Sequence, residues 1–372
     1  MRVLHVYAGN LYGGVEAMLA TFARHADAAG GMEPRFALCF DGRLARELRE
    51  AGNPPSILGA VRLRRPWTAI RARRALDRVL DEARPDVVAC HSAWSHAVFA
   101  PVVRRRGLPL VFWLHDAVTG RTAVERMARR AGPDLAVCTS RYVETTLPRL
   151  FPHVRSAVVY PSVAPPPDPR SGRDDVRRAL GTAAEDVVIV QASRMEPWKG
   201  HRVHLEALAL LRDVPGWTCW LAGGAQRPHE ARHRRELGAF AAERGIAGRV
   251  RFLGERADVP RLFAAADVHC QPNLGPEPFG IAYVEALYAG LPVIASDLGG
   301  AAEIVDDSCG ARVPAGDARA VADALRRLVG DPDLRTRLGA AGPARARALC
   351  DPAAQAARLH GLLTDLAAGG RA

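Results

Sequence analysis

The segment VLHVYAGNLYGGVEAMLATFARHADAAGGMEPRFALCF, residues 3–40, sets the pattern for the whole chain. It holds two continuous apolar runs, at residues 3–7 and 36–40, on either side of an amphipathic stretch of helical length at 15–29. Runs that are apolar at every position are typical of strands buried on both faces of a parallel sheet. We therefore interpret the segment as a strand, a helix and a second strand parallel to the first.

The same alternation continues through the 372 residues and predicts an α/β fold. The front half has further strand-like runs at 87–90, 110–114, 135–138 and 157–160, and helical patterns at 67–83 and 121–130. A second series of runs follows at 187–191, 218–222, 250–253, 268–271 and 293–295, with helical patterns between them. The tail from residue 331 onward is helical in pattern, and we expect Asp331 and Asp333 to cap its helix rather than to bind a metal.

A proline-rich stretch, residues 160–173, separates the two series and is interpreted as an interdomain linker. We expect an N-terminal, acceptor-binding Rossmann-like domain at 1–163, a C-terminal, nucleotide-sugar-binding Rossmann-like domain at 164–348, and a C-terminal helix at 349–372 that packs on the N-terminal domain. Two such domains in tandem predict one ligand cleft, between the carboxyl ends of two facing sheets.

Composition excludes several classes of protein. A chain that is 48% hydrophobic and 24% charged is neither disordered nor fibrous. The seven cysteines form no C-x-x-C pair, which argues against a disulfide framework or a zinc ribbon and suits a reducing cytoplasm. The apolar start is too short for a signal peptide, and the longest uncharged stretch, residues 87–103, is too polar to span a bilayer. We therefore predict a cytoplasmic protein.

Positive charge is concentrated in the front half. Residues 1–165 hold 24 Arg against 14 Asp and Glu, a net +10, whereas residues 166–372 hold 27 basic against 26 acidic residues, a net +1. Nucleic acid, an anionic lipid surface or plain solvent could each face such a surface. Of the 51 basic residues only Lys199 is a lysine, and a compact ammonium in an Arg-rich chain can mark a site that a guanidinium fork does not fit.

Two segments have the character of anion sites. The loop Gly9-Asn10-Leu11-Tyr12-Gly13-Gly14-Val15-Glu16 joins the first strand to the first helix, where glycines and a helix N-terminus admit an anion, although a plain tight turn is the alternative. It is not G-x-G-x-x-G, which weakens a dehydrogenase interpretation. Arg194 and Lys199 follow the first strand of the second domain and can converge on one polyanion, unless they form a solvated rim.

Two carboxylates and two histidines complete the candidate site. Glu277 lies in a loop that opens a helix and Glu285 lies within that helix, so the pair more plausibly grips two parts of one hydroxyl-rich ligand than acts as a hydrolytic acid and base. A salt-bridged helix pair is the structural alternative. His91 with Ser92, and His115 with Asp116, follow adjacent strands, where side chains face the expected cleft.

These segments, in this order, resemble retaining glycosyltransferase family 4, which has the two-domain GT-B fold. The resemblance rests on Gly13-Gly14-Val15-Glu16, His115-Asp116, Arg194 with Lys199-Gly200, and residues 250–254. Its most specific part is residues 267–305, where Glu277-Pro278-Phe279-Gly280 with Glu285 is similar to the family's E-x7-E element and Gly299-Gly300-Ala301-Ala302-Glu303-Ile304-Val305 to the stretch after it.

The resemblance implies transfer of a hexose, with retention, from a nucleoside diphosphate sugar to a saccharide or lipid-linked acceptor, and it implies no metal. The catalytic residues would be His115, Arg194, Lys199 and Glu277. The donor, a UDP-sugar by preference or a GDP-sugar, would contact the residues Gly13, Gly14, Arg194, Lys199, Leu253, Glu277, Phe279, Gly280, Ile281 and Glu285. The acceptor would contact His91, Ser92 and Asp116.

Two loops depart from the family pattern. Tyr160-Pro161-Ser162-Val163 replaces an Asn-Gly-Val-Asp turn, and Gly223-Gly224-Ala225 replaces Gly-Asp-Gly. Neither departure removes a residue with an implied chemical role. They leave open the geometry of these loops and the base of the donor.

The charge of the front half predicts a membrane contact. A basic stretch beside Trp67 comprises Arg62, Arg64, Arg65, Arg71, Arg74 and Arg78, which suits a helix at an anionic surface, or one that is merely solvated. We expect peripheral attachment to the cytoplasmic membrane face and no nucleic-acid partner. Two alternatives remain: an epimerase or hydrolase of nucleotide sugars on the same fold, and a polyanion-binding protein.

Overall fold

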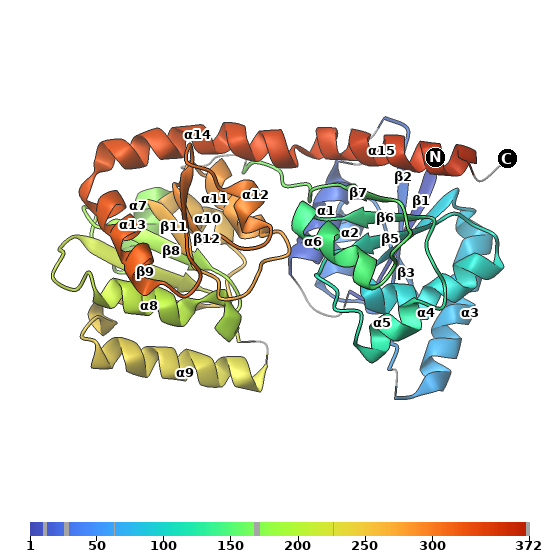
Figure 1. The fold of residues 1–372 in the computed structure, drawn as a ribbon, viewed down its shortest axis with the longest axis horizontal. Helices are drawn as coiled ribbons and strands as arrows, with labels where there is room; N and C mark the ends of the chain where they lie inside the picture. Colours follow the sequence, from blue (N-terminus) through green and yellow to red (C-terminus); the bar gives the residue numbers. More distant parts are fainter. Residues whose placement is uncertain (10–12, 26–29, 63, 167–171, 226, 370–372) are drawn as a thin grey trace. The chain divides into compact units, whose positions relative to one another are not determined.

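The computed structural model describes residues 1–9, 13–25, 30–62, 64–166, 172–225 and 227–369. Parts of several predicted segments lie outside the described residues. They are the middle of the proposed linker, three residues of the first loop (10–12), the end of the first predicted helix and one residue of the basic stretch. The chain divides into two compact units, residues 1–164 with 350–372, and residues 165–349. Each unit is a parallel sheet flanked by helices (Figure 1).

The first unit has the strand order β3-β2-β1-β4-β5-β6-β7, in which all pairs are parallel. Its strands are β1 (Arg2–Tyr7), β2 (Glu33–Leu38), β3 (Ser56–Ile57), β4 (Val87–His91), β5 (Leu110–Leu114), β6 (Leu135–Cys138) and β7 (Ser156–Val158). Its helices are α1 (Gly14–Arg24), α2 (Arg43–Glu50), α3 (Pro66–Ala83), α4 (Ser92–Arg105), α5 (Ala123–Ala128), α6 (Arg141–Thr146), the short η2 (Leu147–Arg149) and α15 (Pro352–Gly369).

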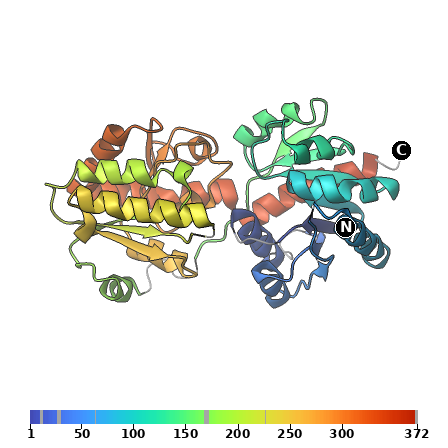
Figure 2. The same cartoon turned by 90° about the horizontal axis from the view of Figure 1, so that it is seen from below.

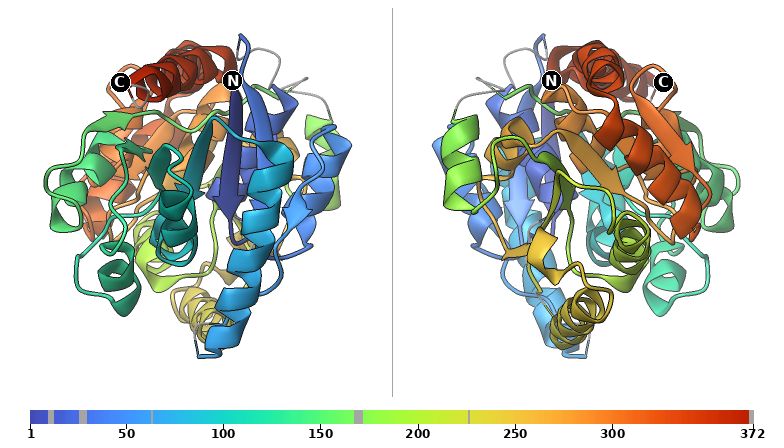
Figure 3. Two further views of the ribbon diagram at one scale, coloured as in Figure 1. Left: turned by 90° about the vertical axis from the view of Figure 1, so that its right-hand side faces the viewer. Right: turned by 90° about the vertical axis from the view of Figure 1, so that its left-hand side faces the viewer.

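Alternating side chains of β1 place helices on both faces of this sheet. Leu4 and Val6 belong to a buried apolar cluster with residues of α3 and α4, including Leu76. His5, between them, points the other way and its ring lies against Phe22 of α1, with ring centroids 5.3 Å apart. Since successive side chains of a strand face opposite sides, α1 covers the face opposite α3 and α4 (Figure 3, left).

The second unit has the strand order β10-β9-β8-β11-β12-β13, again parallel. Its strands are β8 (Val187–Ala192), β9 (Trp217–Ala222), β10 (Val250–Gly254), β11 (Val268–Gln271), β12 (Val293–Ser296) and β13 (Gly310–Val313). Its helices are α7 (Arg173–Ala179), η3 (Pro197–Lys199), α8 (His201–Ala209), α9 (Pro228–Glu243), η4 (Ala247–Arg249), α10 (Val259–Ala265), α11 (Ile281–Tyr288), α12 (Ala301–Ile304), α13 (Ala318–Gly330) and α14 (Pro332–Cys350). Helices α8 and α9 run side by side (Figure 2).

Most sequence predictions of elements are confirmed, with shifted ends. The strands predicted at 36–40 and 157–160 end earlier, at Leu38 and Val158, and the helix predicted at 121–130 is shorter. Two edge strands, β3 and β13, were not predicted. Asp331 caps α14 as expected, because its Oδ1 accepts a hydrogen bond from the Leu334 amide at 2.8 Å. Among the described helices, none combines the length and apolar character needed to cross a bilayer.

Each sheet reverses its strand order once. In the first unit this switch point lies between β1 and β4, and in the second between β8 and β11. The loops that follow such a pair of strands run in opposite directions and leave a crevice at the carboxyl edge, where α/β proteins commonly bind ligands. Arg194, Lys199 and Glu277 follow the switch-point strands of the second unit, and Gly13, Gly14 and Ser92 follow those of the first. His115 and Asp116 follow β5, and Leu253 lies in β10.

Candidate active site

Lys199 and Glu277 meet at the switch point of the second unit. Lys199 ends η3, in the loop after β8, and Glu277 lies in the loop after β11. The Lys199 Nζ is 2.5 Å from Glu277 Oε2, and both side chains are nearly buried. The same Nζ lies 4.1 Å from the centroid of the Trp198 ring, a cation–π contact. The lone lysine is therefore held between an aromatic face and a carboxylate.

Two side-chain amides, those of Asn273 and Gln271, contact the Glu277 carboxylate. Asn273 Nδ2 donates to Glu277 Oε2 at 2.8 Å, and Gln271 Nε2 lies 3.4 Å from the same oxygen. Tyr283 of α11 belongs to the same network, because its hydroxyl donates a hydrogen bond to the Gln271 backbone carbonyl at 3.1 Å. Oε1 of Glu277 has no hydrogen-bond partner among the described residues. One oxygen of Glu277 is thus fixed by the protein, and the other is available to a ligand.

Arg194 is held by two carboxylates of its own unit. Its Nη2 lies 3.1 Å from Glu196 Oε2, and its Nη1 lies 3.8 Å from Glu230 Oε1 of α9. Trp198 Nε1 donates to Glu196 Oε2 at 3.0 Å, so the same carboxylate links Arg194 to the Lys199 loop. The Arg194 side chain remains 35% exposed. These contacts orient the Arg194 guanidinium group while leaving part of it accessible to a bound anion.

Two glycines let the Glu277 loop approach a neighbouring turn. Gly300 donates its amide to the Glu277 carbonyl at 2.7 Å, and a Cβ at Gly300 would lie 2.5 Å from the Phe279 Cα. Gly280, at φ +105°, precedes α11, and a Cβ there would lie 2.4 Å from the Tyr283 ring. The block around Gly300 therefore supports the loop that presents Glu277, Phe279 and Gly280.

Glu285 lies in α11, one turn beyond Ile281. It is half-buried, and its side chain makes no hydrogen bond or ion pair with the described residues. Burial without a partner raises the pKa of Glu285 to about 7. No Arg, Lys or His of the described residues forms an ion pair with Glu285, so the salt-bridged alternative is wrong for Glu285, whereas Glu277 is paired with Lys199.

The ends of β8, β9 and β10 meet beside Arg194. The Gly223 amide donates to the Gly254 carbonyl at 2.8 Å, and the Met195 amide lies 3.4 Å from the Gly224 carbonyl. A Cβ at Gly223 would lie 1.8 Å from the Ser193 carbonyl oxygen, so no side chain fits there. Leu253 is half-buried at the end of β10, next to this junction.

In the first unit, Gly13 and Gly14 lie exposed at the start of α1. The buried Glu16 fixes this turn, since its Oε2 accepts from the Gly13 amide at 2.9 Å and its Oε1 accepts from the Tyr7 hydroxyl at 2.9 Å. Burial and the Glu16 carboxylate raise the pKa of Tyr7, which keeps its hydroxyl a donor. The backbone amides of this turn are thereby held in place at the switch point.

A cavity of about 480 Å³ lies at the carboxyl edge of the first sheet. Ser92 and Asp116 line it, whereas His91 is fully buried and is not among the described lining residues. Ser92 adopts a left-handed backbone at φ +73°, a conformation that costs energy outside glycine. The described lining residues are Tyr7, Ala8, Phe40, Val61, Ser92, Ala93, Trp94, Leu114, Asp116, Ala117, Val118, Thr122, Val124 and Glu125, and none of these is Arg or Lys.

His115 follows β5 and is almost completely buried, at 5% exposure. Its Nε2 lies 2.8 Å from Nδ1 of His91, and Nε2 of His91 lies 2.9 Å from Nδ1 of His5. Both ring nitrogens of His91 are therefore used inside the protein, which leaves none for the acceptor contact predicted for it. Burial lowers the pKa of His115 to about 3, so the ring is neutral at physiological pH.

Sequence reasoning missed several residues of these networks. Asn273 and Gln271 have a usable signal, since they follow or end the strand before Glu277. Glu196 and Trp198 lie between the predicted Arg194 and Lys199, and His5 is hidden in an apolar strand run.

Comparisons with known proteins give the family. A profile described as Glycosyl transferases group 1 matches residues 172–345, and one described as Glycosyltransferase Family 4 matches residues 12–165. A phosphatidyl-myo-inositol mannosyltransferase of Mycobacterium leprae is 41% identical over 40% of this chain and 38% of its own length. A GDP-mannose-dependent alpha-(1-6)-phosphatidylinositol monomannoside mannosyltransferase of Mycolicibacterium smegmatis is 29% identical over 82% of this chain and 81% of its own.

Among solved structures, HepE of Anabaena in complex with UDP superposes with a TM-score of 0.83, at 24% identity, covering 98% of this chain and 100% of that one. This likeness concerns the fold alone. The alignment with the M. leprae protein spans less than half of that relative. The two profiles together match residues of both units, including Lys199, Glu277 and Glu285, and the chain belongs to the glycosyltransferase family 4 and glycosyl transferases group 1 enzymes.

Proposed function

We propose that this protein transfers a hexose from a nucleoside diphosphate sugar to a saccharide or lipid-linked acceptor, with retention of anomeric configuration. The observation that carries the proposal is the pair Lys199 and Glu277 at the switch point of the second sheet, with Arg194 beside it. A cation next to a carboxylate with a free oxygen suits a ligand that is both anionic and rich in hydroxyls.

In this proposal Arg194 and Lys199 bind the diphosphate and stabilise the charge that develops on it as the sugar leaves. Glu277 Oε1 accepts from sugar hydroxyls, and the amides of Phe279, Gly280 and Ile281 support the phosphate. The two cations carry out the neutralisation that a divalent metal performs in other transferases, so we expect activity without metal.

Glu285 binds the ribose hydroxyls of the donor. Its carboxyl group lacks a partner among the described residues, and two ribose hydroxyls supply the hydrogen bonds that offset its burial. Leu253 lines the base pocket, beside the Gly223-Gly224 turn. We favour UDP as the nucleotide of the donor, because a structure of the same fold was solved with UDP. GDP is the alternative, since a relative is named as GDP-mannose-dependent.

Retention is explained when the acceptor hydroxyl attacks the face that the leaving group vacates. The bond from the anomeric carbon to the phosphate oxygen breaks, a bond to the acceptor oxygen forms, and the departing phosphate takes the acceptor proton. No side chain then acts as a strong base. This agrees with a neutral, buried His115, whose low pKa makes it a poor proton acceptor.

The cavity of the first unit is the proposed acceptor site. Aromatic side chains of Tyr7, Phe40 and Trp94 and the carboxylate of Asp116 suit the faces and hydroxyls of a sugar ring. Without Arg or Lys among its described lining residues, the cavity suits the uncharged part of an acceptor. Any anionic part of a lipid-linked acceptor requires a different, basic surface.

The exposed surface of α3, which follows Val61 of the cavity wall, supplies such a surface. Trp67 is 57% and Ile70 is 49% exposed, and the cations around them are exposed as well: Arg62, Arg64, Arg65, Arg71, Arg74 and Arg78. We propose that this surface binds the anionic cytoplasmic leaflet, since apolar insertion and basic attraction act together. The test is flotation with phosphatidylglycerol vesicles at low salt. Wild type should float, Trp67→Glu should not, and failure of wild type to float would remove the membrane contact.

The donor experiment separates transfer from the alternatives. Purified protein is incubated with UDP-glucose, UDP-galactose or GDP-mannose, in a chelator, with and without a panel of alkyl glycosides. We expect one donor to be consumed mainly when an acceptor is present, with an α-linked product. Consumption independent of acceptor would favour a hydrolase, and a changed sugar on the nucleotide would favour an epimerase. Salt-sensitive binding of polyanions without turnover would favour the polyanion-binding alternative.

A further inference from the structure

Three buried histidines form a row across adjacent strands of the first sheet. His5 lies in β1, His91 ends β4 and His115 follows β5, and these strands are neighbours. The ring nitrogens are 2.9 Å apart between His5 and His91, and 2.8 Å apart between His91 and His115. The rings of His91 and His115 are nearly parallel, at 9°. The row connects the site at the carboxyl edge with the interior of the unit.

Burial keeps all three rings neutral. It lowers the pKa of His5 and of His115 to about 3, and that of His91 well below its ordinary value. A neutral imidazole has one N–H donor and one acceptor nitrogen. His91 must therefore donate to one neighbour and accept from the other, so both hydrogen bonds run in the same direction. The row has two arrangements only, and they differ in whether Nδ1 of His115 carries a proton.

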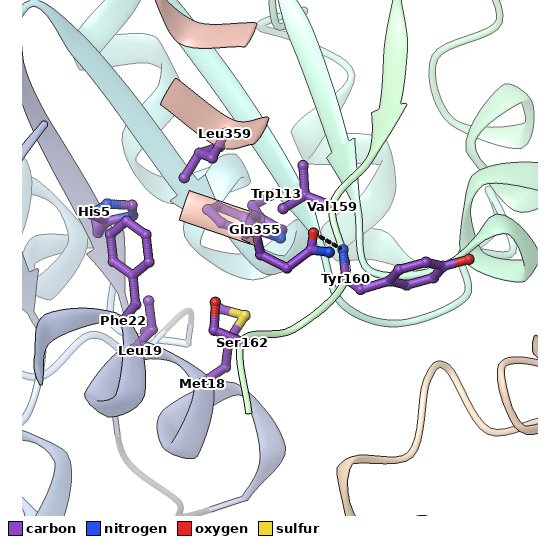
Figure 4. Close-up of a pocket in the computed structure, with 10 residues that line it drawn as sticks. All are labelled: His5, Met18, Leu19, Phe22, Trp113, Val159, Tyr160, Ser162, Gln355 and Leu359. Atoms are coloured by element: carbon purple, nitrogen blue, oxygen red, sulfur yellow. Dashed lines mark hydrogen bonds between the residues drawn. The ribbon is translucent and has the colours of Figure 1, made fainter. Parts of the chain in front are cut away.

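The inner end of the row borders a small cavity. Nε2 of His5 and Nε1 of Trp113 are both buried without a hydrogen-bond partner among the described residues. Both side chains line a cavity of about 10 Å³, together with Ser162 and with Gln355 of α15 (Figure 4). About 10–15 Å³ on this measure holds one water molecule, and such a water requires at least two polar partners.

One water satisfies both of these nitrogens in only one direction of the row without further acceptors. The indole N–H of Trp113 can only donate, so the water accepts from it and donates to Nε2 of His5. In the reverse direction the water would accept from both rings and need two other acceptors. The Ser162 hydroxyl and Gln355 Oε1, which also accepts from the Tyr160 amide at 3.1 Å, are the side-chain acceptors that line the cavity. The first direction needs only the two ring nitrogens, and on that ground we assign the proton of His5 to Nδ1, from which it is donated to His91.

We propose that His5 and His91 are positioning residues which, with one water at Trp113, hold His115 as the tautomer protonated on Nδ1. His115 Nδ1 has no hydrogen-bond partner among the described residues. Its N–H is then presented as a donor to a hydroxyl or phosphoryl oxygen. This part rests on the proposed function, in which that oxygen belongs to the nucleotide sugar. The tautomer itself is a property of the free protein.

The charged and titratable groups near the row are few. Tyr7 of β1 lies over His91 with ring centroids 6.2 Å apart, and its hydroxyl is bonded to Glu16 of α1. Asp116 follows His115 directly in the chain and is exposed. The rings of Phe22 and Phe36 flank His5 at 5.3 Å.

The direct test is nitrogen-15 NMR of histidine-labelled, full-length protein without substrate. Long-range proton–nitrogen spectra distinguish Nδ1-protonated, Nε2-protonated and doubly protonated rings, and His115→Gln identifies the His115 signals. We expect His115 to be protonated on Nδ1 and neutral from about pH 8 to about pH 5, where an ordinary histidine would titrate. A proton on Nε2, or a doubly protonated His115 in this range, would overturn the proposal.

Substitution at the far end of the row tests the coupling. His5→Phe fits between Phe22 and Phe36 but removes the donor to His91. We expect the His115 signals to become a mixture of tautomers and kcat/KM to fall roughly tenfold, by analogy with the loss of hydrogen-bond partners that orient metal-ligating histidines. His5→Gln, which can still donate to His91, should recover most of both. An unchanged His115 tautomer in His5→Phe would contradict the coupling.

His96→Phe is the matched control. His96 is a fully buried histidine of α4 in the same unit, 2.6 Å from the Ala131 carbonyl oxygen and outside the row. It should lower stability without changing the His115 signals or kcat/KM. Equal losses of activity in His5→Phe and His96→Phe would mean that His5 is merely structural. If the wild type transfers no sugar but His115 is protonated on Nδ1, the proposed function fails and the row stands.

Discussion

The two units build their switch points from opposite kinds of side chain. In the second unit, Lys199, Arg194 and Glu277 are charged, close to one another and only partly exposed. In the first unit the corresponding position is filled by neutral histidines and an aromatic cavity without described cations. In the proposed function, the same sheet topology serves one site for a polyanion and one site for an uncharged, hydroxyl-rich group. The chemistry depends on a few residues that follow the strands.

The largest expected effect is loss of the lone lysine. Lys199→Ala removes the cation nearest the proposed diphosphate, and loss of one such stabilising group lowers rates by about 10²–10³-fold. We expect kcat/KM to fall by that factor in initial-rate assays with the identified donor. The control is Arg178→Ala, since the Arg178 side chain is 77% exposed and pairs with the exposed Asp175 at 3.0 Å. A similar loss in both variants would contradict a specific role for Lys199.

The neutral histidines of the first unit predict weaker stability in acid. Their pKa values lie below the ordinary 6.5, to about 3 for His5 and His115, so the unfolded chain binds more protons between these values. The free energy of unfolding then falls as the pH drops from about 6.5, by roughly 1 kcal/mol per pH unit for each such ring. Urea titrations of wild type and His5→Phe measure this. Parallel pH profiles of the two proteins would contradict the prediction.

The next effect concerns the approach of two backbones in the second unit. Gly300→Ala introduces a Cβ that would lie 2.5 Å from the Phe279 Cα, although the φ of −65° suits alanine. We expect destabilisation of about 1–3 kcal/mol from overpacking, with weaker donor binding because the Glu277 loop is displaced. Gly238→Ala is the control, since its Cβ meets open space within α9 and should stabilise by roughly 0.5–1 kcal/mol. Unaltered donor affinity in Gly300→Ala would show that the loop does not depend on this contact.

The raised pKa of Glu285 predicts that the free energy of unfolding depends on pH with the opposite sign to that expected from the histidines. Its pKa is raised from 4.5 to about 7, so the folded protein binds the extra proton. The free energy of unfolding of wild type, relative to Glu285→Gln, should fall as the pH rises from about 4.5 to about 7 and then level off, by about 1–3 kcal/mol in total. Denaturation of both proteins across this range checks it. A difference that grows with pH would mean that Glu285 has a charged partner.

The alternation of apolar runs was sufficient to predict the strands that lie inside the sheets. The edge strands β3 and β13 were missed because Ser56–Ile57 has two residues and Gly310–Val313 contains glycine and arginine in place of an apolar run. Edge strands are covered on fewer sides, so their sequences carry a weaker hydrophobic signal. The missing signal is therefore a physical property of these strands.

Motifs predicted the charged half of the site better than its neutral half. Lys199 and Glu277 stand out because a rare lysine and a costly buried carboxylate each require a partner. His5 does not, since a histidine within VLHVY is compatible with any buried strand. Only the strand order, with β1 beside β4 and β4 beside β5, brings His5, His91 and His115 into one row. That order follows from tertiary packing and is not contained in local spacing.

The measurement that tests the account most directly is calorimetric titration of UDP and of GDP into wild type and Lys199→Ala, with a chelator present. The account predicts that one of the two nucleotides binds wild type without metal and that Lys199→Ala loses at least tenfold in affinity, a change of about 1.4 kcal/mol. Binding of neither nucleotide, or equal affinity in Lys199→Ala, would contradict the assignment of this switch point as the donor site.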